Sequence, residues 1–479
     1  MTFLWFDLET FGRDPRLDRI AQFASIRTDE KHEPVEEPVV LYCRIPRDYL
    51  PDPQAVLKTG ITPQETRRRG VREIDFTREI RRLFDVDGTC GVGFNSLAFD
   101  DEFLRSLFFR NFLDPYEREY RRGNSRWDIL NLARLARDLR PEGITWPEKP
   151  DGRPDLRLEA LTAANGIEHT DAHDALADVR ATIALASRIR EAQPKLYQWS
   201  LGLREKERCR GLVDLEGHTP FLHSHTIYTR PGATTTVVAP LAMDLHNPQA
   251  VLVFDLRYDP TPFLGRSAEE LRATAFTPRR EQPDEEHLPV SRVALNKVPA
   301  IAPEATLDDE GAKRLGIDRR AVAAHLEVIR NNPSFLRKVR SAFAPVEKGI
   351  FRDVEEQLYA GFVPDSDRSL YGEIHRLSPE ELLRWEPPFR DERLPTLYHR
   401  FLMRNYEELL EPEQRRDWYR EAARRILLPP STKLKDLEEY ELRVSQILGD
   451  PQRDESERRT AEELKRYAES VRATLPIDD

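Results

Sequence analysis

The first 195 residues alternate between dense apolar runs and helical patterns. Phe3–Glu9, Ile20–Ile26 and Val39–Ile45 are rich in β-branched and aromatic residues, as buried strands are. A shorter run, Cys90–Phe94, predicts a fourth strand before the chain becomes mainly helical. Strands interleaved with helices predict an α/β domain in which helices cover a sheet.

Capping residues mark the ends of helices in this first block. Apolar positions in Ile129–Leu139 recur at helical spacing, and Asp128 stands at the N-cap position. A last helix is expected to begin near Asp174 and to continue through Ala192, with Pro194 marking its stop.

Residues 196–348 follow a different pattern. Strand-like runs such as Thr234–Val238 and Ala250–Leu256 are separated by turns rich in proline and glycine. This pattern predicts a small β-barrel or sandwich with helices attached to it.

Residues 349–479 combine helical periodicity with many charges. Trp418–Leu428 and Tyr440–Leu448 have apolar residues at helical spacing. The stretch between Gly449 and Ala461 is almost all charge, so we expect a partly mobile tail there. The three blocks predict three domains, with the boundaries 1–195, 196–348 and 349–479.

Length and composition indicate several globular domains. A chain of 479 residues corresponds to about two to four domains. No stretch approaches the roughly 18–20 apolar residues of a membrane span, and the N-terminus lacks the basic start of a signal peptide. The cysteines form no CxxC pair, which excludes a thiolate zinc site and predicts a cytoplasmic protein. They are Cys43, Cys90 and Cys209.

The net charge of −11 argues, at first sight, against a nucleic-acid partner. However, residues 350–479 contain 22 basic and 30 acidic residues, so most of the excess belongs to the last block. Of the 74 basic residues, 62 are arginine, which binds phosphate through paired hydrogen bonds; a GC-rich genome would produce the same bias. A confined arginine-lined channel for a polyanion is therefore compatible with the charge.

Two acids on the first predicted strand are the first chemical signal. Asp7 and Glu9 are two residues apart, so both carboxylates project from one face of the strand. Burying two like charges unpaired is costly, and a divalent cation such as Mg²⁺ removes that cost. A strand end in solvent is the alternative interpretation of this pair alone.

A second group of acids follows directly after the fourth predicted strand, within Asn95–Asp101. Loops at the ends of buried strands are where α/β domains place their chemistry. One of the two aspartates is expected to cap a helix at Glu102–Phe109. We assign metal binding to Asp100 and helix capping to Asp101.

The third signal combines a histidine with an acid. His173 lies just before the last helix of the first block, and Asp178 lies within its first two turns. On one regular helix the two would point about 140° apart, but with His173 in the entering loop both can face one site. Taken alone, this spacing is more typical of a capping or surface histidine.

Together the three signals resemble the DEDDh 3′→5′ exonucleases, whose motifs occur in this order and on these elements. The resemblance implies a ribonuclease-H-like domain with two Mg²⁺ ions, for which Mn²⁺ can substitute, held by Asp7, Glu9, Asp100 and Asp178. Asp7 would bridge the ions that clamp the scissile phosphate, and Asp100 would act mainly through water. His173 would take the proton of the attacking water. The implied catalytic set is Asp7, Glu9, Asp100, His173 and Asp178.

Further segments resemble the bacterial exodeoxyribonuclease I family, in the order of the three blocks and as far as about Asn405. Leu8 stands where that family usually has an aromatic residue, and Tyr120 where it has tryptophan. The segments are Phe99–Glu102, Arg110–Phe112, Asp114–Tyr116, Asn124–Asp128, Leu139–Ile144, Arg157–Glu159, Ala164–His169, Val238–Ala242, Leu295–Lys297, Arg314–Ile317, Gln357–Tyr359, Gly361–Phe362 and Asp365–Arg368.

This closer resemblance implies an exonuclease domain, an SH3-like β-barrel domain and a helical C-terminal domain. It implies processive 3′→5′ degradation of single-stranded DNA to 5′-mononucleotides by a monomer, in DNA repair and recombination. It also implies a partner, the single-stranded DNA-binding protein, which docks through its acidic C-terminal tail. An RNA 3′-exonuclease and a catalytically silent single-strand-binding scaffold are the alternatives. The large second and third blocks disfavour the former, and the complete set of five site residues disfavours the latter.

The segment Arg105–Arg134 interleaves arginine with aromatic residues. Single strands are held by aromatic side chains that stack on bases and by cations on phosphates. Arg157 is expected near the terminal nucleotide. The predicted substrate contacts are Glu9, Arg105, Tyr116, Tyr120, Arg134 and Arg157.

Overall fold

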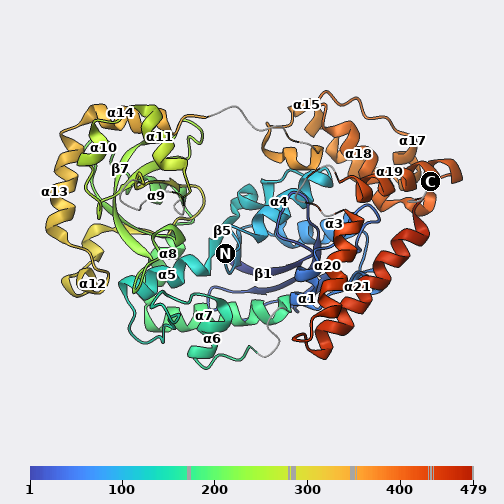
Figure 1. Ribbon diagram of the computed structural model, residues 1–479, viewed down its shortest axis with the longest axis horizontal. Coiled ribbons are helices and arrows are strands. Elements are labelled where there is room, and N and C mark those ends of the chain that lie inside the picture. Colours follow the sequence, from blue (N-terminus) through green and yellow to red (C-terminus); the bar gives the residue numbers. More distant parts are fainter. Residues whose placement is uncertain are drawn as a thin grey trace. The chain divides into compact units, whose positions relative to one another are not determined.

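The chain divides into two compact units in the computed structural model (Figure 1). One unit comprises Met1–Ser125, Thr170–Arg180 and Gly349–Asp479; the other comprises Arg126–His169 and Ala181–Lys348. The C-terminal residues therefore pack with the first sheet. The structure describes residues 1–169, 174–278, 281, 287–345, 351, 353–429, 431, 434 and 436–476.

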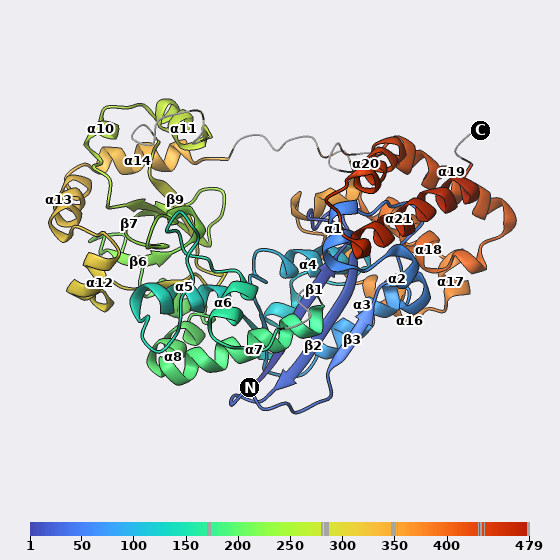
Figure 2. The ribbon, with the colours of Figure 1, turned by 60° about the horizontal axis from the view of Figure 1, so that its bottom comes forward.

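The centre of the first unit is formed by β3, β2, β1 and β4 of a five-stranded sheet with the order β3-β2-β1-β4-β5, and Ser125 is the one residue of β5 that belongs to this unit. β1 pairs antiparallel with β2 and parallel with β4, and Figure 2 shows β1, β2 and β3 side by side. The predicted strands are confirmed, except that β3 ends three residues before Ile45. The bounds are β1 (Thr2–Thr10), β2 (Ile20–Thr28), β3 (Val39–Tyr42), β4 (Thr89–Gly93) and β5 (Ser125–Asp128).

Helices follow the strands of this sheet and cover it with apolar side chains. Phe76 and Ile80 on one helix and Phe103 on another are fully buried with Phe6 and Phe23 of the sheet. The bounds are α1 (Pro53–Thr59), α2 (Pro63–Arg69), α3 (Glu73–Phe84), α4 (Asp100–Arg110) and α7 (Ala175–Ala192), the last of which begins in this unit.

The C-terminal helices share one apolar core with the N-terminal residues. Phe11 and Val56 pack in the same cluster as Phe401, Tyr440 and Tyr467. The bounds are η6 (Val354–Tyr359), α15 (Asp365–Arg368), α16 (Tyr371–Arg376), α17 (Pro379–Arg384), α18 (Leu394–Asn405), α19 (Pro412–Leu427), α20 (Leu437–Gly449) and α21 (Glu455–Thr474).

The expectation of a partly mobile tail after Gly449 is wrong for most of that stretch, because α21 begins at Glu455. Asp454 and Glu457 form a capping box at its start, which satisfies backbone N–H groups that would otherwise lack partners. Leu464 and Tyr467 are buried against the rest of the unit.

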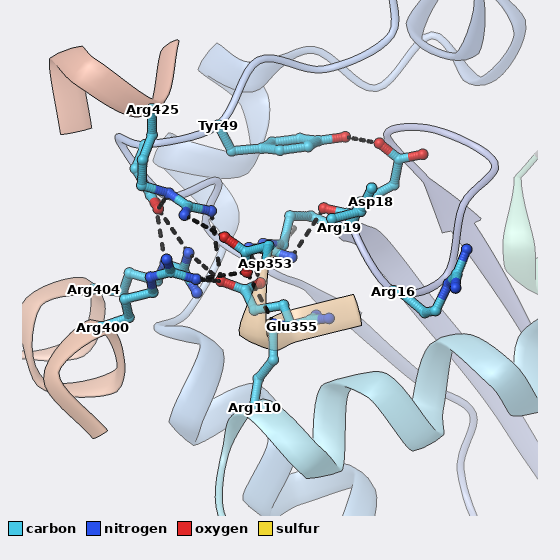
Figure 3. A network of polar contacts seen from close by, with 12 residues as sticks. Arg16, Asp18, Arg19, Tyr49, Arg110, Asp353, Glu355, Arg400, Arg404 and Arg425 are labelled. Carbon is cyan, nitrogen blue, oxygen red and sulfur yellow. Dashed lines mark hydrogen bonds and ion pairs between the residues drawn. The ribbon is translucent and has the colours of Figure 1, made fainter. Parts of the chain in front are cut away.

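A buried network of charges joins the C-terminal helices to the loop between β1 and β2 and to the segment between β3 and α1 (Figure 3). Arg19 donates to Glu355 of η6 at 2.6 Å, and Arg404 of α18 donates to Glu355 at 2.7 Å. Arg404 and Arg425 both donate to Asp48, at 2.6 and 3.0 Å. Against the effect of burial, these arginines hold the pKa values of Glu355 and Asp48 well below their ordinary values.

The second unit contains an antiparallel sheet in the order β10-β6-β7-β8-β9. Its strands are β6 (Phe221–Ser224), β7 (Thr235–Met243), β8 (Ala250–Asp255), β9 (Val290–Ala294) and β10 (Ile301–Pro303). Its helices are α5 (Ile129–Leu139), α6 (Leu158–Ala164), α8 (Pro194–Gly202), α9 (Lys206–Arg210), α10 (Thr261–Leu264), α11 (Ala268–Phe276), α12 (Asp309–Arg314), α13 (Arg319–Arg330) and α14 (Pro333–Ala342).

A buried carboxylate on α5 forms hydrogen bonds to this sheet. Asp138 accepts hydrogen bonds from the backbone N–H and the hydroxyl of Thr234, and from the hydroxyl of Thr235. Asp128 caps α5 through the N–H of Leu130, as predicted. Pro194 opens α8, so it marks a new helix as well as the end of α7.

Among the described residues, no helix is both long enough and apolar enough to span a membrane.

Candidate active site

Three acids converge where β1 meets the start of α7. Asp7 and Glu9 lie on β1, and Asp178 lies in the first turn of α7. A carboxylate oxygen from each lies within 4.8 Å of the others, and Glu9 is buried while Asp7 and Asp178 are partly buried. The structure thus brings together three of the four predicted metal ligands.

The carboxylates repel one another in a poorly solvated place. Burial, followed by repulsion from Asp100, Glu9 and Asp178, raises the pKa of Asp7 well above its ordinary value. Burial and the neighbouring Asp178 raise the pKa of Glu9 to about 9. A group of acids that resists ionisation in this way needs either protons or a cation.

Asp100 approaches the same strand from α4. Its Oδ1 accepts a hydrogen bond of 3.1 Å from the backbone N–H of Leu8, the residue between Asp7 and Glu9. The turn before α4 depends on close packing, since a Cβ on Gly93 would lie 2.6 Å from the Cβ of Ser96. Asp100 is therefore held against the strand that carries the other acids.

The assignment of helix capping to Asp101 is wrong. Phe99 occupies the N-cap position of α4 without a side-chain hydrogen bond, and both aspartates lie inside the helix. Asp101 instead accepts a hydrogen bond of 2.6 Å from Arg118, and both side chains are 2% exposed. The carboxylate of Asp101 thus serves a buried charge-assisted hydrogen bond and not a helix cap.

The start of α7 is fixed by Asp174, which precedes the helix. Its Oδ1 accepts from the N–H groups of Leu176 and Ala177, at 3.1 and 3.2 Å. The N–H of Asp178 donates to the carbonyl oxygen of Asp174 at 3.0 Å, so Asp178 follows one turn later. His173 lies outside the described residues, and its role stays a prediction.

The donor set fits a divalent cation. Asp7, Glu9 and Asp178 offer only carboxylate oxygens, the ligands that hard cations such as Mg²⁺ and Mn²⁺ prefer. A cation among them would offset the repulsion that raises the pKa values of Asp7 and Glu9.

Lys58 near the end of α1 is a neighbour of this site that the sequence motifs do not reveal. Its positive charge offsets part of the rise that burial and the neighbouring carboxylates cause in the pKa values of Asp7 and Glu9. The sequence offers only one signal for Lys58, which is its position directly before Thr59-Gly60-Ile61. This segment contains no acidic residue.

The predicted strand contacts of the first unit differ in how accessible they are. Tyr120 is 63% exposed, as a base-stacking residue requires. Arg105 is buried; it donates to both oxygens of Glu119 at 2.7 and 2.8 Å and lies over the ring of Tyr116. A phosphate would have to displace Glu119 from Arg105, whereas Tyr120 is free to stack on a base.

The other two predicted contacts lie in the second unit. Arg134 donates to Asn131 at 2.8 Å and to Thr226 at 2.9 Å, and burial lowers its pKa. The side chain of Arg157 is 72% exposed and donates to both oxygens of Asp155.

Three family models match consecutive parts of the chain. The model described as Exonuclease matches residues 4–186, the Exonuclease I SH3-like domain matches 204–345, and the Exonuclease I C-terminal domain matches 352–471. These matches confirm the predicted fold class, an exonuclease domain followed by an SH3-like domain and a C-terminal domain.

Relatives and solved structures agree over almost the whole length. Exodeoxyribonuclease I of Escherichia coli K12 is 41% identical over 453 residues, which cover 94% of this chain and 95% of that protein. The E. coli exonuclease I structure with a dA16 oligonucleotide has a TM-score of 0.94 and 39% identity, and covers 98% of this chain and 99% of its own. A moderately thermophilic exonuclease I from Methylocaldum szegediense has a TM-score of 0.93 and 43% identity over the same shares.

Other solved forms of the E. coli enzyme have further molecules in them. One is the zinc-ion-bound form of its complex with single-stranded DNA. A further matching structure is of SSB and exonuclease I in complex with an inhibitor. With three matching domain models in order, and 41% identity across nearly the full length of a curated relative, the chain belongs to the exodeoxyribonuclease I family.

Proposed function

We propose that this protein degrades single-stranded DNA from its 3′ end and releases 5′-mononucleotides. The observation that carries the proposal is the cluster of Asp7, Glu9 and Asp178, placed by β1 and α7 within 4.8 Å of one another. The relatives support the choice of substrate, because the E. coli enzyme is solved with DNA oligonucleotides.

The catalytic cations are proposed to be two Mg²⁺ ions, with Mn²⁺ as a substitute. Asp7 would contact both, while Glu9 and Asp178 would hold one each and Asp100 would act through water. Such ions, when bound, supply positive charge that stabilises the phosphoryl group in the transition state. The protein's contribution is to keep three repelling carboxylates together, which β1 and α7 do.

His173 is the proposed general base, because it directly precedes Asp174 at the start of α7. A histidine with an ordinary pKa of about 6.5 can accept a proton at neutral pH. The DNA strand is proposed to contact Tyr116, Tyr120, Arg105 and Arg134. Arg157 is proposed to lie near the terminal nucleotide, and Glu9 is the remaining proposed substrate contact.

Further properties follow from family membership as proposals. The domain boundaries 1–195, 196–348 and 349–479 are supported by the three matched ranges. The acidic tail of the single-stranded DNA-binding protein is a proposed partner, supported by a similar structure of SSB and exonuclease I. The protein is further proposed to be a cytoplasmic monomer that acts processively in DNA repair and recombination.

The direct test incubates the protein with Mg²⁺ and either DNA or RNA labelled at the 3′ end. Wild type should release label from single-stranded DNA, and Asp178→Asn, which keeps the size of the side chain, should release at least about 100-fold less. Release from RNA alone would replace the proposed substrate with RNA. Strand binding without release from either would leave a single-strand-binding scaffold.

A further inference from the structure

A row of three side chains crosses the first sheet at the level of the carboxylates. In the ladder between β1 and β2, Glu9 is the direct neighbour of Gln22, and in the ladder between β2 and β3, Gln22 is the direct neighbour of Tyr42. Directly opposed residues in antiparallel strands project from the same face. Gln22 therefore lies next to a predicted metal ligand, and it is 1% exposed.

The amide of Gln22 holds the start of α7 at two points. Its Oε1 accepts from the backbone N–H of Ala175 at 3.1 Å, and its Nε2 donates to Oδ2 of Asp174 at 3.2 Å. The second N–H of Nε2 donates to the hydroxyl of Tyr42 at 2.9 Å. The orientation of the amide is thus fixed, because its oxygen must face an N–H and its nitrogen a carboxylate.

The row is also supported from its outer end. Arg69 of α2 stacks over the ring of Tyr42, with its guanidinium carbon 4.0 Å from the ring centre. Tyr42 in turn accepts the hydrogen bond from Gln22. Movement of the Gln22 amide away from α7 would break its hydrogen bonds to the start of α7 and to Tyr42. The amide therefore holds the start of α7 at a fixed distance from β2.

We propose that Gln22 is a positioning residue that sets the distance between Glu9 and Asp178, and with it the affinity of the site for a divalent cation. Asp178 is tied to Asp174 by a backbone hydrogen bond of 3.0 Å, so a shift of the helix start carries Asp178 with it. Glu9 and Asp178 lie on different elements, and Gln22 is the described side chain that bonds to the helix start from the strand beside Glu9. The proposal rests on the proposed function, since it concerns the same carboxylates.

The test measures Mn²⁺ binding by calorimetry on the full-length protein, without nucleic acid. Gln22→Met keeps the length of the side chain and removes all three hydrogen bonds. Partners that orient metal ligands typically change metal affinity by about 10–100-fold, so the Mn²⁺ affinity of Gln22→Met should fall at least about tenfold. Tyr42→Phe removes one of the bonds and should give a smaller loss.

Thr28→Val is the matched control on the same strand. It removes a buried hydrogen bond of 2.8 Å from Trp5 Nε1 at the far end of β2, so it tests general destabilisation. Mn²⁺ affinity should stay at the wild-type value in this variant. Wild-type affinity in Gln22→Met, or an equal loss in Thr28→Val, would overturn the proposal; if Gln22→Met does not fold, an unchanged affinity in Tyr42→Phe would do so. A wild-type chain that binds Mn²⁺ but degrades no DNA would overturn the proposed function alone.

Discussion

The role of each charged or polar side chain in this molecule depends on the residues that lie next to it in the fold. The sequence places Asp7, Glu9 and Asp178 correctly on their elements, because a strand period of two and a helix start can be read locally. It does not reveal that Asp101 pairs with Arg118, 17 residues later, or that Gln22 reaches Asp174, 152 residues later. Those pairings depend on tertiary packing, and no spacing rule encodes them.

His173→Ala should lower the rate of hydrolysis much more than strand affinity, because it removes a proton acceptor and leaves the expected strand contacts in place. General-base catalysis typically contributes about 10²–10⁴-fold to a rate. Single-turnover cleavage and oligonucleotide binding without added metal measure the two quantities separately. Equal losses in both would contradict the assigned role.

Asp101→Ala should destabilise the fold by about 3–5 kcal/mol, because it leaves the buried guanidinium of Arg118 without its carboxylate. Urea unfolding measures the loss. Asp85→Ala, which removes a more exposed carboxylate, is the control and should change stability by less than about 1 kcal/mol. A loss as small as the control's would mean that the buried pair contributes little.

At the scale of elements, local pattern predicts the strands better than the last helix. β1 and β2 are dense in apolar and aromatic residues, so their burial is evident without knowledge of their partners. α21 has a narrow apolar face, and its stability depends on a core that it shares with residues near the N-terminus. Such long-range packing cannot be read from a window of sequence.

Tyr467→Ala should cost about 3–5 kcal/mol of folding stability, as truncation of a buried aromatic side chain does. Tyr467 is 1% exposed, and its hydroxyl donates to the carbonyl oxygen of Tyr49 at 3.0 Å. Glu469→Ala, at an exposed position of the same helix, should be nearly neutral. Thermal unfolding compares the two variants, and similar midpoints would show that α21 does not stabilise the unit.

For the whole molecule, the buried charge network predicts how stability depends on pH. The pKa values of Glu355 and Asp48 are lowered in the folded state, so their stabilisation is complete above their unfolded values of about 4 and is lost as pH falls. The pKa values of Asp7 and Glu9 are raised in the folded state. In the absence of metal, their contribution to stability therefore increases as pH falls.

Urea unfolding at pH 7, 5 and 4 tests this dependence by comparison of wild type with Glu355→Gln. The variant should be less stable at pH 7, and the difference from wild type should begin to shrink near pH 4, because the unfolded wild-type chain then takes up a proton at Glu355 while the folded chain keeps this carboxylate ionised. The comparison cancels the contribution of Asp7 and Glu9, which both proteins share. A difference that stays constant with pH would contradict the role of Glu355.

The central claim is that this chain removes nucleotides one at a time from the 3′ end of single-stranded DNA at the site of Asp7, Glu9 and Asp178. The most direct measurement follows an oligonucleotide of mixed sequence by mass spectrometry during digestion with Mg²⁺. Nucleoside 5′-monophosphates should appear in the order of the sequence read from the 3′ end, and Asp178→Asn should release almost none. Release from the 5′ end, products with a 3′-phosphate, or internal fragments would contradict the account.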